Sequence, residues 1–244
     1  MTIIFEIFED LPRQGPGLNE CTRQAYEMLT GLPERPEILD IGCGAGTQTI
    51  ELARLFPGRI TATDVHEPML DELRRRARAA DAADRIVVQN MSMSELTFPD
   101  ESFDVIWSEG AIFIIGFQEG LKAWRRLLKP GGYMVVSEAT WFVEDPPLEV
   151  KEFWNSCYPA ITQARNNVRM AEEAGYRVVG TFRLPDEGWF DFYRPLGPKL
   201  AALRKKYHNN PEALAELAFC EREIEIYDKY HESYGYTFFV LRKA

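Results

Sequence analysis

Short apolar runs recur along the first half of the chain, separated by stretches whose apolar residues repeat at helical spacing. This pattern predicts strands at 37–41, 59–64, 85–89, 103–107 and 133–137, and helices at 47–56, 68–80 and 118–128. Strands that alternate with helices indicate a parallel sheet covered on both faces. We therefore expect an α/β fold.

The segments on either side of this alternation have a different rhythm. Residues 3–11 and 22–32 have helical spacing, while 167–174 and 176–182 predict a helix and then a strand. Residues 185–233 are mainly helical in pattern, and 236–241 form a last apolar strand. The predicted organisation is one domain over 1–244: an N-terminal helical lid (1–33), a cofactor-binding core (34–184), a helical insertion (185–233) and a final strand (234–244).

Composition and charge exclude several classes of protein. The 244 residues include 45% hydrophobic residues, as expected for a globular protein with a substantial core. The net charge of −10 argues against nucleic acid as a partner. The longest apolar run, at 111–117, has seven residues, and the acidic N-terminus does not resemble a signal peptide, so no membrane partner is expected. The four cysteines and three histidines have no metal-ligand spacing, which predicts a cytoplasmic protein without a metal.

A glycine-rich segment carries the clearest chemical signal. The strand at 37–41 runs into Gly42-Cys-Gly44-Ala-Gly46, directly before a predicted helix. Such a turn lets the backbone approach a ligand closely, with the amides at the helix N-terminus facing it. Asp64 ends the next strand, where a carboxylate can accept hydrogen bonds from both hydroxyls of a ribose. The segment therefore predicts a nucleotide-type ligand at the carboxyl edge of the sheet.

The details of the motif separate two kinds of ligand. The dinucleotide fingerprint requires glycine at position 47, which is Thr47 here. Asp40 with the three alternating glycines instead resembles motif I of the class I S-adenosylmethionine-dependent methyltransferases. Residues 91–106 resemble the third and fourth motifs of that family, and 127–133 the turn before its fifth strand. The resemblance implies S-adenosyl-L-methionine as cofactor and a Rossmann-like, seven-stranded, mostly parallel sheet with helices on both faces, a helical insertion and an antiparallel last strand.

Three further segments, 13–17, 107–112 and 137–142, resemble a bacterial subgroup of small-molecule-type methyltransferases. Ser92 departs from the family, in which many members carry Asp to accept a hydrogen bond from the adenine amino group. The cofactor-binding residues that the resemblance implies are Arg13, Asp40, Gly42, Cys43, Gly44, Gly46, Asp64, Val65, Ser92, Met93 and Ser108.

Two glutamates follow strands at the carboxyl edge and are the predicted catalytic residues. Glu109 and Glu138 are candidates for a base that deprotonates the acceptor, with His231 a weaker one. A second interpretation of Glu109 stays open, as a helix-entry acid that contacts only the cofactor or water. Bulky aromatics outside the sheet pattern are predicted to bind the acceptor, although such residues also form cores. They are Trp141, Tyr158, Trp189 and Tyr193.

The predicted function is methyl transfer from S-adenosylmethionine to a small-molecule acceptor by in-line displacement, in a monomer or homodimer. The Asn/Asp-Pro-Pro-Tyr motif of amino-methylating DNA enzymes is absent, and Trp107-Ser-Glu-Gly110 stands in its place. Two alternatives stay open: a nicotinamide-dependent oxidoreductase and a non-catalytic S-adenosylmethionine-binding protein.

Overall fold

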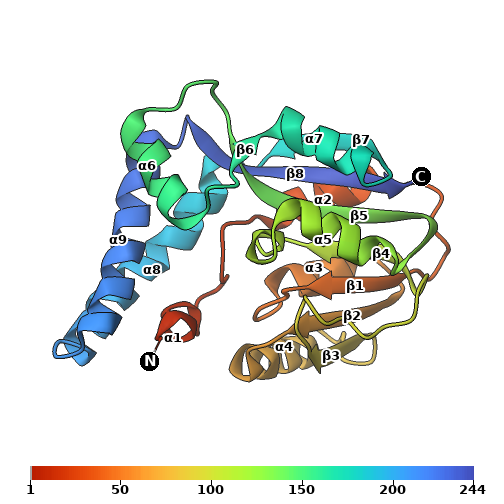
Figure 1. Cartoon of the computed structure of the whole chain (residues 1–244). Coiled ribbons are helices and arrows are strands. Elements are labelled where there is room, and N and C mark those ends of the chain that lie inside the picture. The colour runs from red at the N-terminus through yellow and green to blue at the C-terminus, as the bar shows by residue number, and fades with distance from the viewer. Residues whose placement is uncertain (1) are drawn as a thin grey trace.

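A mixed sheet forms the centre of the molecule in the computed structural model, which describes residues 2–244 (Figure 1). Seven strands follow the order β3-β2-β1-β4-β5-β8-β7, and a two-residue strand, β6, pairs with β5. Strand β8 runs antiparallel between β5 and β7, and the other pairs are parallel. The predicted fold class is therefore confirmed. The bounds are β1 Glu37–Ile41, β2 Arg59–Asp64, β3 Ile86–Asn90, β4 Phe103–Ser108, β5 Leu128–Trp141, β6 Thr162–Gln163, β7 Tyr176–Arg183 and β8 Tyr234–Lys243.

Helices cover both faces of the sheet. On one face, α2 (Asn19–Glu27), α3 (Thr47–Leu55) and α4 (Glu67–Ala79) share a hydrophobic core with Ile38. On the other face, α5 (Phe117–Arg125) and α7 (Ala164–Glu173) share a second core with Leu39. Successive residues of a strand point to opposite faces of the sheet. Because helices cover both faces, the strands are apolar throughout rather than alternating.

A separate group of helices stands beyond the carboxyl ends of the parallel strands, on the left of Figure 1. It consists of α6 (Leu148–Cys157), α8 (Asp186–Lys206) and α9 (Pro211–Tyr230). Its packing is largely aromatic: the rings of Trp189 in α8 and Tyr227 in α9 stack with centroids 4.5 Å apart. The short helix α1 (Ile4–Phe8) packs against α8. No helix in the described range 2–244 is both long and apolar enough to cross a membrane.

Some element bounds differ from those that the sequence predicted. Helix α1 is shorter than 3–11 because the backbone of Glu9 is extended, with ψ 152°, and Asp10 follows at φ +59°. Helix α2 begins before residue 22 and ends at Glu27, where the amides of Met28 and Leu29 donate to carbonyls three residues back, those of Ala25 and Tyr26. Strand β5 starts at Leu128, where the sequence predicted a helix end and a turn, because Leu128 pairs with Phe103 ahead of a register shift.

Candidate active site

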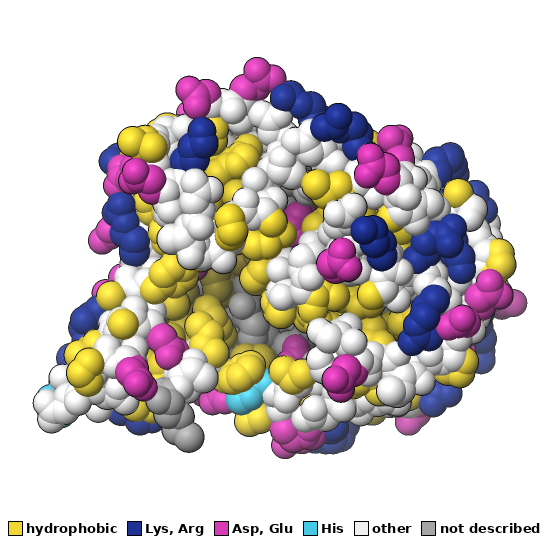
Figure 2. All heavy atoms as spheres, viewed as in Figure 1, with side chains coloured by type: hydrophobic (Ala, Val, Ile, Leu, Met, Phe, Trp, Pro, Cys, Tyr) yellow, Lys and Arg dark blue, Asp and Glu magenta, His cyan; other side chains and the backbone are white. Residues whose placement is uncertain are grey.

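A cavity of about 710 Å³ lies at the carboxyl ends of the parallel strands. Its walls come from the glycine-rich loop and the ends of β2 and β3, from η1 (Ile112–Ile114), and from α6, α8 and α9. Helix α1 and residues 13–16 border it as well. Figure 2 shows the hollow between the sheet and the helical group, with hydrophobic side chains around it. A volume of this size is typical of sites that enclose a small molecule.

The three glycines of the motif all have positive φ, at +71° for Gly42, +53° for Gly44 and +80° for Gly46. Gly42 and Gly44 line the cavity together with Cys43. A Cβ atom on Gly42 would lie 2.6 Å from Cβ of Ala111, which leaves no room for a side chain. The loop therefore presents bare backbone to the cavity, which is the arrangement that the sequence pattern predicts for ligand binding.

Asp40, Gly46 and Ser108 lie behind the loop and do not line the cavity. Asp40 is fully buried and accepts a 2.6 Å hydrogen bond from Oγ1 of Thr49, and burial raises its pKa to about 7. The Ser108 hydroxyl donates to the carbonyl of Ile41 at 2.9 Å. In this geometry the three residues hold the loop in place, so any part they have in cofactor binding is indirect.

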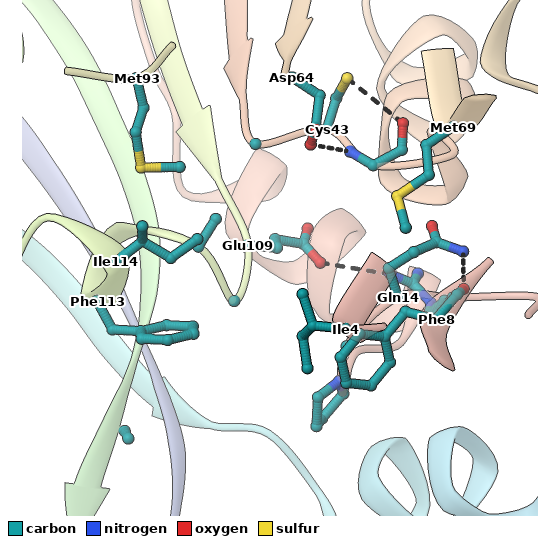
Figure 3. Close-up of a pocket in the computed structure, with 18 of the residues that line it drawn as sticks. Ile4, Phe8, Gln14, Cys43, Asp64, Met69, Met93, Glu109, Phe113 and Ile114 are labelled. Atoms are coloured by element: carbon teal, nitrogen blue, oxygen red, sulfur yellow. Dashed lines mark hydrogen bonds and ion pairs between the residues drawn. The ribbon is translucent and has the colours of Figure 1, made fainter. Parts of the chain in front are cut away.

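Asp64 lies at the cavity wall and is joined to the loop. Its Oδ2 accepts a hydrogen bond from the Gly44 amide at 2.9 Å, and its Oδ1 accepts one from the His66 amide at 3.1 Å. Val65, Ser92 and Met93 line the cavity nearby. Asp64 and Cys43 lie on one side of the cavity in Figure 3, with Met93 on the other. A carboxylate beside bare amides and apolar side chains suits a ligand with both a ribose and a base.

Gln14 lines the cavity but was not among the residues predicted from the sequence. Its Oε1 accepts a 2.9 Å hydrogen bond from the Ala45 amide, and its Nε2 donates to the carbonyl of Leu11 at 3.0 Å. Ile4 and Phe8 of α1 lie beside it (Figure 3). Gln14 thus ties the N-terminal segment to the glycine-rich loop. The one sequence feature that could have predicted this role is that Gln14 lies within the segment 13–17, which resembles the methyltransferase subgroup.

Glu109 and Arg13 both line the cavity and form an ion pair at 3.7 Å. Oε1 of Glu109 accepts hydrogen bonds from the Thr22 hydroxyl at 2.7 Å and from the Trp107 indole at 2.8 Å. Oε2 of Glu109 faces Arg13 and has no hydrogen-bond partner among residues 2–244. The Glu109 side chain is only 4% exposed, so its orientation is fixed by these contacts.

Glu138 is buried under the cavity and does not line it. Burial raises the pKa of its carboxyl to about 8, and the neighbouring Tyr158 hydroxyl, which does line the cavity, offsets only part of that rise. In this geometry Glu138 reaches the cavity through Tyr158. His231 lies outside the cavity, with Nδ1 2.8 Å from Oδ2 of Asp186.

The four aromatics predicted to bind the acceptor occupy three kinds of position. Tyr158 and Trp189 line the cavity. Tyr193 is buried behind its wall and donates a 2.9 Å hydrogen bond to Oε1 of Glu223, which does line it. Trp141 packs edge-on against Tyr234 and does not line the cavity, so this geometry gives it no acceptor contact. Glu223 was missed because no motif marks it within the helical region.

Comparisons with known proteins find similarity to methyltransferases. Residues 38–132 match a family model described as "Methyltransferase domain". Residues 38–132 therefore match a methyltransferase domain, in agreement with the resemblance of the motifs to the class I S-adenosylmethionine-dependent methyltransferases. The matched segment contains the glycine-rich loop, Asp64 and Glu109.

Similar chains cover different shares of the molecule. The 27-O-demethylrifamycin SV methyltransferase of Amycolatopsis mediterranei is 33% identical over 125 residues, 50% of this chain and 46% of that protein. The chain spans roughly half the length of the curated relatives that it matches first. A Geobacter sulfurreducens methyltransferase solved with S-adenosyl-L-homocysteine has the same fold, with a TM-score of 0.85 and 21% identity over 100% of this chain and 99% of that one. The [4+2]-cyclase SpnF also shares the fold, with a TM-score of 0.72 and 21% identity over 92% of this chain and 80% of that one.

Proposed function

We propose that this protein transfers a methyl group from S-adenosylmethionine to a small-molecule acceptor by in-line displacement. One observation carries the proposal: a single cavity joins the glycine-rich loop and Asp64 of the methyltransferase domain to an enclosed aromatic wall. The name of the rifamycin methyltransferase relative, which refers to a small-molecule acceptor, supports the choice of acceptor class.

The residues around the cavity fit this cofactor. Gly42 and Gly44 present backbone without a side chain at the cavity wall, and Asp64 offers acceptor oxygens for ribose hydroxyls. The exposed side chain of Val65 and the thioether of Met93 supply apolar surface for a base, and Arg13 supplies a cation for a carboxylate. When bound, the cofactor supplies an electrophilic methyl group on a sulfonium sulfur.

The main contribution of this chain to the reaction is to position the acceptor relative to the methyl group. Holding an acceptor in line with the methyl group is worth about 7–11 kcal/mol of the barrier when the alignment is good. Helix α1 and the loop at residues 13–16 border the cavity, and Gln14 fixes them to the glycine-rich loop. These segments exclude water from the reacting atoms while they stay closed.

A base is needed only where the acceptor arrives protonated. Glu109 keeps one oxygen free of hydrogen bonds among residues 2–244, but that oxygen faces Arg13, so its contacts favour a role in orienting Arg13. Glu138 is a base candidate that acts through Tyr158. Because its pKa is about 8, the carboxyl is mostly protonated at neutral pH, and only the ionised fraction, which grows as pH rises, acts as the base. Both assignments stay part of the proposal.

The first test is cofactor affinity measured by calorimetry on the wild type and on Asp64→Ala. Losing the hydrogen bonds of a charged group costs about 1.5–3 kcal/mol, so the affinity for S-adenosylmethionine should fall about 10- to 150-fold. Asp71→Ala, which removes an exposed acid of α4, is the matched control and should leave the affinity unchanged. Because Asp64 also accepts hydrogen bonds from the backbone, Asp64→Asn and a melting curve separate loss of binding from loss of folding. Equal affinity of the wild type and Asp64→Ala would refute the role of Asp64.

Two alternatives are separated by further measurements. Protection against thermal unfolding by a nicotinamide cofactor, and not by S-adenosylmethionine, would support an oxidoreductase. Mass spectrometry of a metabolite mixture incubated with labelled cofactor detects turnover. The fold of a [4+2]-cyclase resembles this one, which makes turnover the necessary readout. Cofactor binding without labelled product from any metabolite mixture would favour a non-catalytic binding protein.

A further inference from the structure

One end of the cavity is lined by α6, α8, α9 and β8 and is rich in aromatic side chains. We call it the helical end, and it is formed by Phe153, Trp154, Trp189, Phe219, Glu223 and Tyr236. The rings pack closely, with centroids 5.3 Å apart for Phe153 and Phe219 and 4.7 Å apart for Trp189 and Tyr236. One carboxyl group, that of Glu223, lies among these rings.

Glu223 has an unusual electrostatic environment. The Tyr193 hydroxyl donates to its Oε1 at 2.9 Å. Burial raises the pKa of Glu223, and this hydrogen bond offsets only part of the rise. No Lys or Arg of the described chain forms an ion pair with it. A carboxylate partly removed from water without a cation is costly, so a positively charged ligand would be stabilised here.

Most of the charged groups around the whole cavity are negative. Its charged lining residues, among those described, are three carboxylates, Asp64, Glu109 and Glu223, and one cation, Arg13. Arg13 is already paired with Glu109. The helical end therefore offers negative charge and aromatic faces, and both attract cations.

We infer that the methyl acceptor carries a positively charged nitrogen, which Glu223 and the aromatic rings bind at the helical end of the cavity. The inference rests on the proposed function and narrows its acceptor to small amines with an apolar body. Acceptors whose only charge is a carboxylate or phosphate are excluded from this end, because like charges repel. The inference concerns recognition of the ammonium group, whichever atom of the acceptor takes the methyl.

A matched pair of probes tests the inference on the full chain saturated with S-adenosylhomocysteine. 2-Phenylethylammonium and 2-phenylethanol share a skeleton and differ in the charge of the terminal group. Calorimetry should show the ammonium binding at least about tenfold more tightly, a difference of about 1.4 kcal/mol. Glu223→Gln should abolish that preference while leaving the affinity for S-adenosylhomocysteine intact. Glu225→Gln, the same change at an exposed position on α9, should keep it.

The outcomes distinguish this inference from the proposed function. Equal affinity for the two probes, no ammonium binding at millimolar concentration, or a preference that survives Glu223→Gln each overturns the amine inference. In all three cases the affinity for S-adenosylhomocysteine, measured on the same sample, still tests the proposed function. Loss of that affinity in the wild type contradicts the proposed function itself.

Discussion

Replacing Gly46 by alanine should destabilise the fold through two separable causes. Gly46 is the N-cap of α3 and has φ +80°, a conformation that costs an L-residue about 1–2 kcal/mol. The new Cβ would also lie 2.1 Å from Cδ1 and 3.2 Å from Cβ of Leu73, a fully buried residue of α4. Because Cβ of Leu73 is itself close, a change of rotamer alone cannot remove the conflict.

The magnitudes follow from these contacts. Overpacking a core by one methyl group costs about 1–3 kcal/mol, so Gly46→Ala should cost about 2–5 kcal/mol in total. Leu73→Ala alone should cost about 2–5 kcal/mol because it leaves a cavity. In the double variant the methyl group added at position 46 occupies space that the Leu73 side chain vacates. The backbone cost of Gly46→Ala and the 3.2 Å contact with Cβ of residue 73 then remain, but the much closer contact with Cδ1 is gone. This predicts a favourable coupling of about 1–3 kcal/mol between the two substitutions.

Urea unfolding of the wild type, both single variants and the double variant measures this coupling. Gly31→Ala is the control for the backbone cost alone, because Gly31 has φ +70° and no described atom lies within 4 Å of the place that its Cβ would take. It should cost about 1–2 kcal/mol. Additive effects of Gly46→Ala and Leu73→Ala, to within about 0.5 kcal/mol, would refute the steric argument and leave only the backbone one.

Two further predictions concern the cavity wall. The pKa of Glu138 is raised from 4.5 to about 8 in the folded protein, so wild-type stability should fall as pH rises between these values, when only the unfolded state loses the proton. Glu138→Gln should remove this part of the pH dependence in urea unfolding at pH 5 and pH 9, and an equal dependence in both proteins would contradict it. Gln14→Ala breaks the hydrogen bond to the Ala45 amide, worth about 0.5–1.5 kcal/mol. Hydrogen exchange should therefore quicken across residues 2–17, whereas Gln163→Ala, far along the chain, should not change it.

The sheet could be predicted because its signals are local. Strands β1, β2, β4 and β5 are largely buried, so their apolar runs stand out, and the intervening helices repeat at their own spacing. The element ends were less accurate because they depend on single backbone conformations. The extended backbone of Glu9, at ψ 152°, ends α1, and a register shift near Phe103 brings Leu128 into β5. Neither event leaves a mark in the pattern of apolar residues.

The site residues that carry a local sequence motif could also be predicted, whereas those placed by distant contacts could not. The glycine-rich loop and Asp64 carry a motif, and the structure brings them to one cavity. Gln14 and Glu223 also border it, but each does so through a distant partner, the Ala45 amide for Gln14 and the Tyr193 hydroxyl for Glu223. Trp141 has the residue type of an acceptor contact, yet packing against Tyr234 takes it away from the cavity. Residue type therefore predicts which side chains can act, and packing decides which of them reach the ligand.

The three glycines of the loop show how much one motif contains. A side chain at Gly42 would meet Ala111 after β4, one at Gly44 would meet Gln14 of the N-terminal segment, and one at Gly46 would meet Leu73 of α4. Three segments that are distant in the sequence thus pack against this one short loop, each at a position where glycine has no side chain. Such a loop can be recognised from its sequence because every neighbour excludes a side chain at a fixed spacing. At the helical end of the cavity no set of neighbours excludes side chains at a fixed spacing. Its aromatic rings have only to fill the space, and Glu223 has one hydrogen-bond partner, the Tyr193 hydroxyl. Many sequences meet those weaker conditions, which is why the acceptor must be inferred from the charge and shape of the folded cavity.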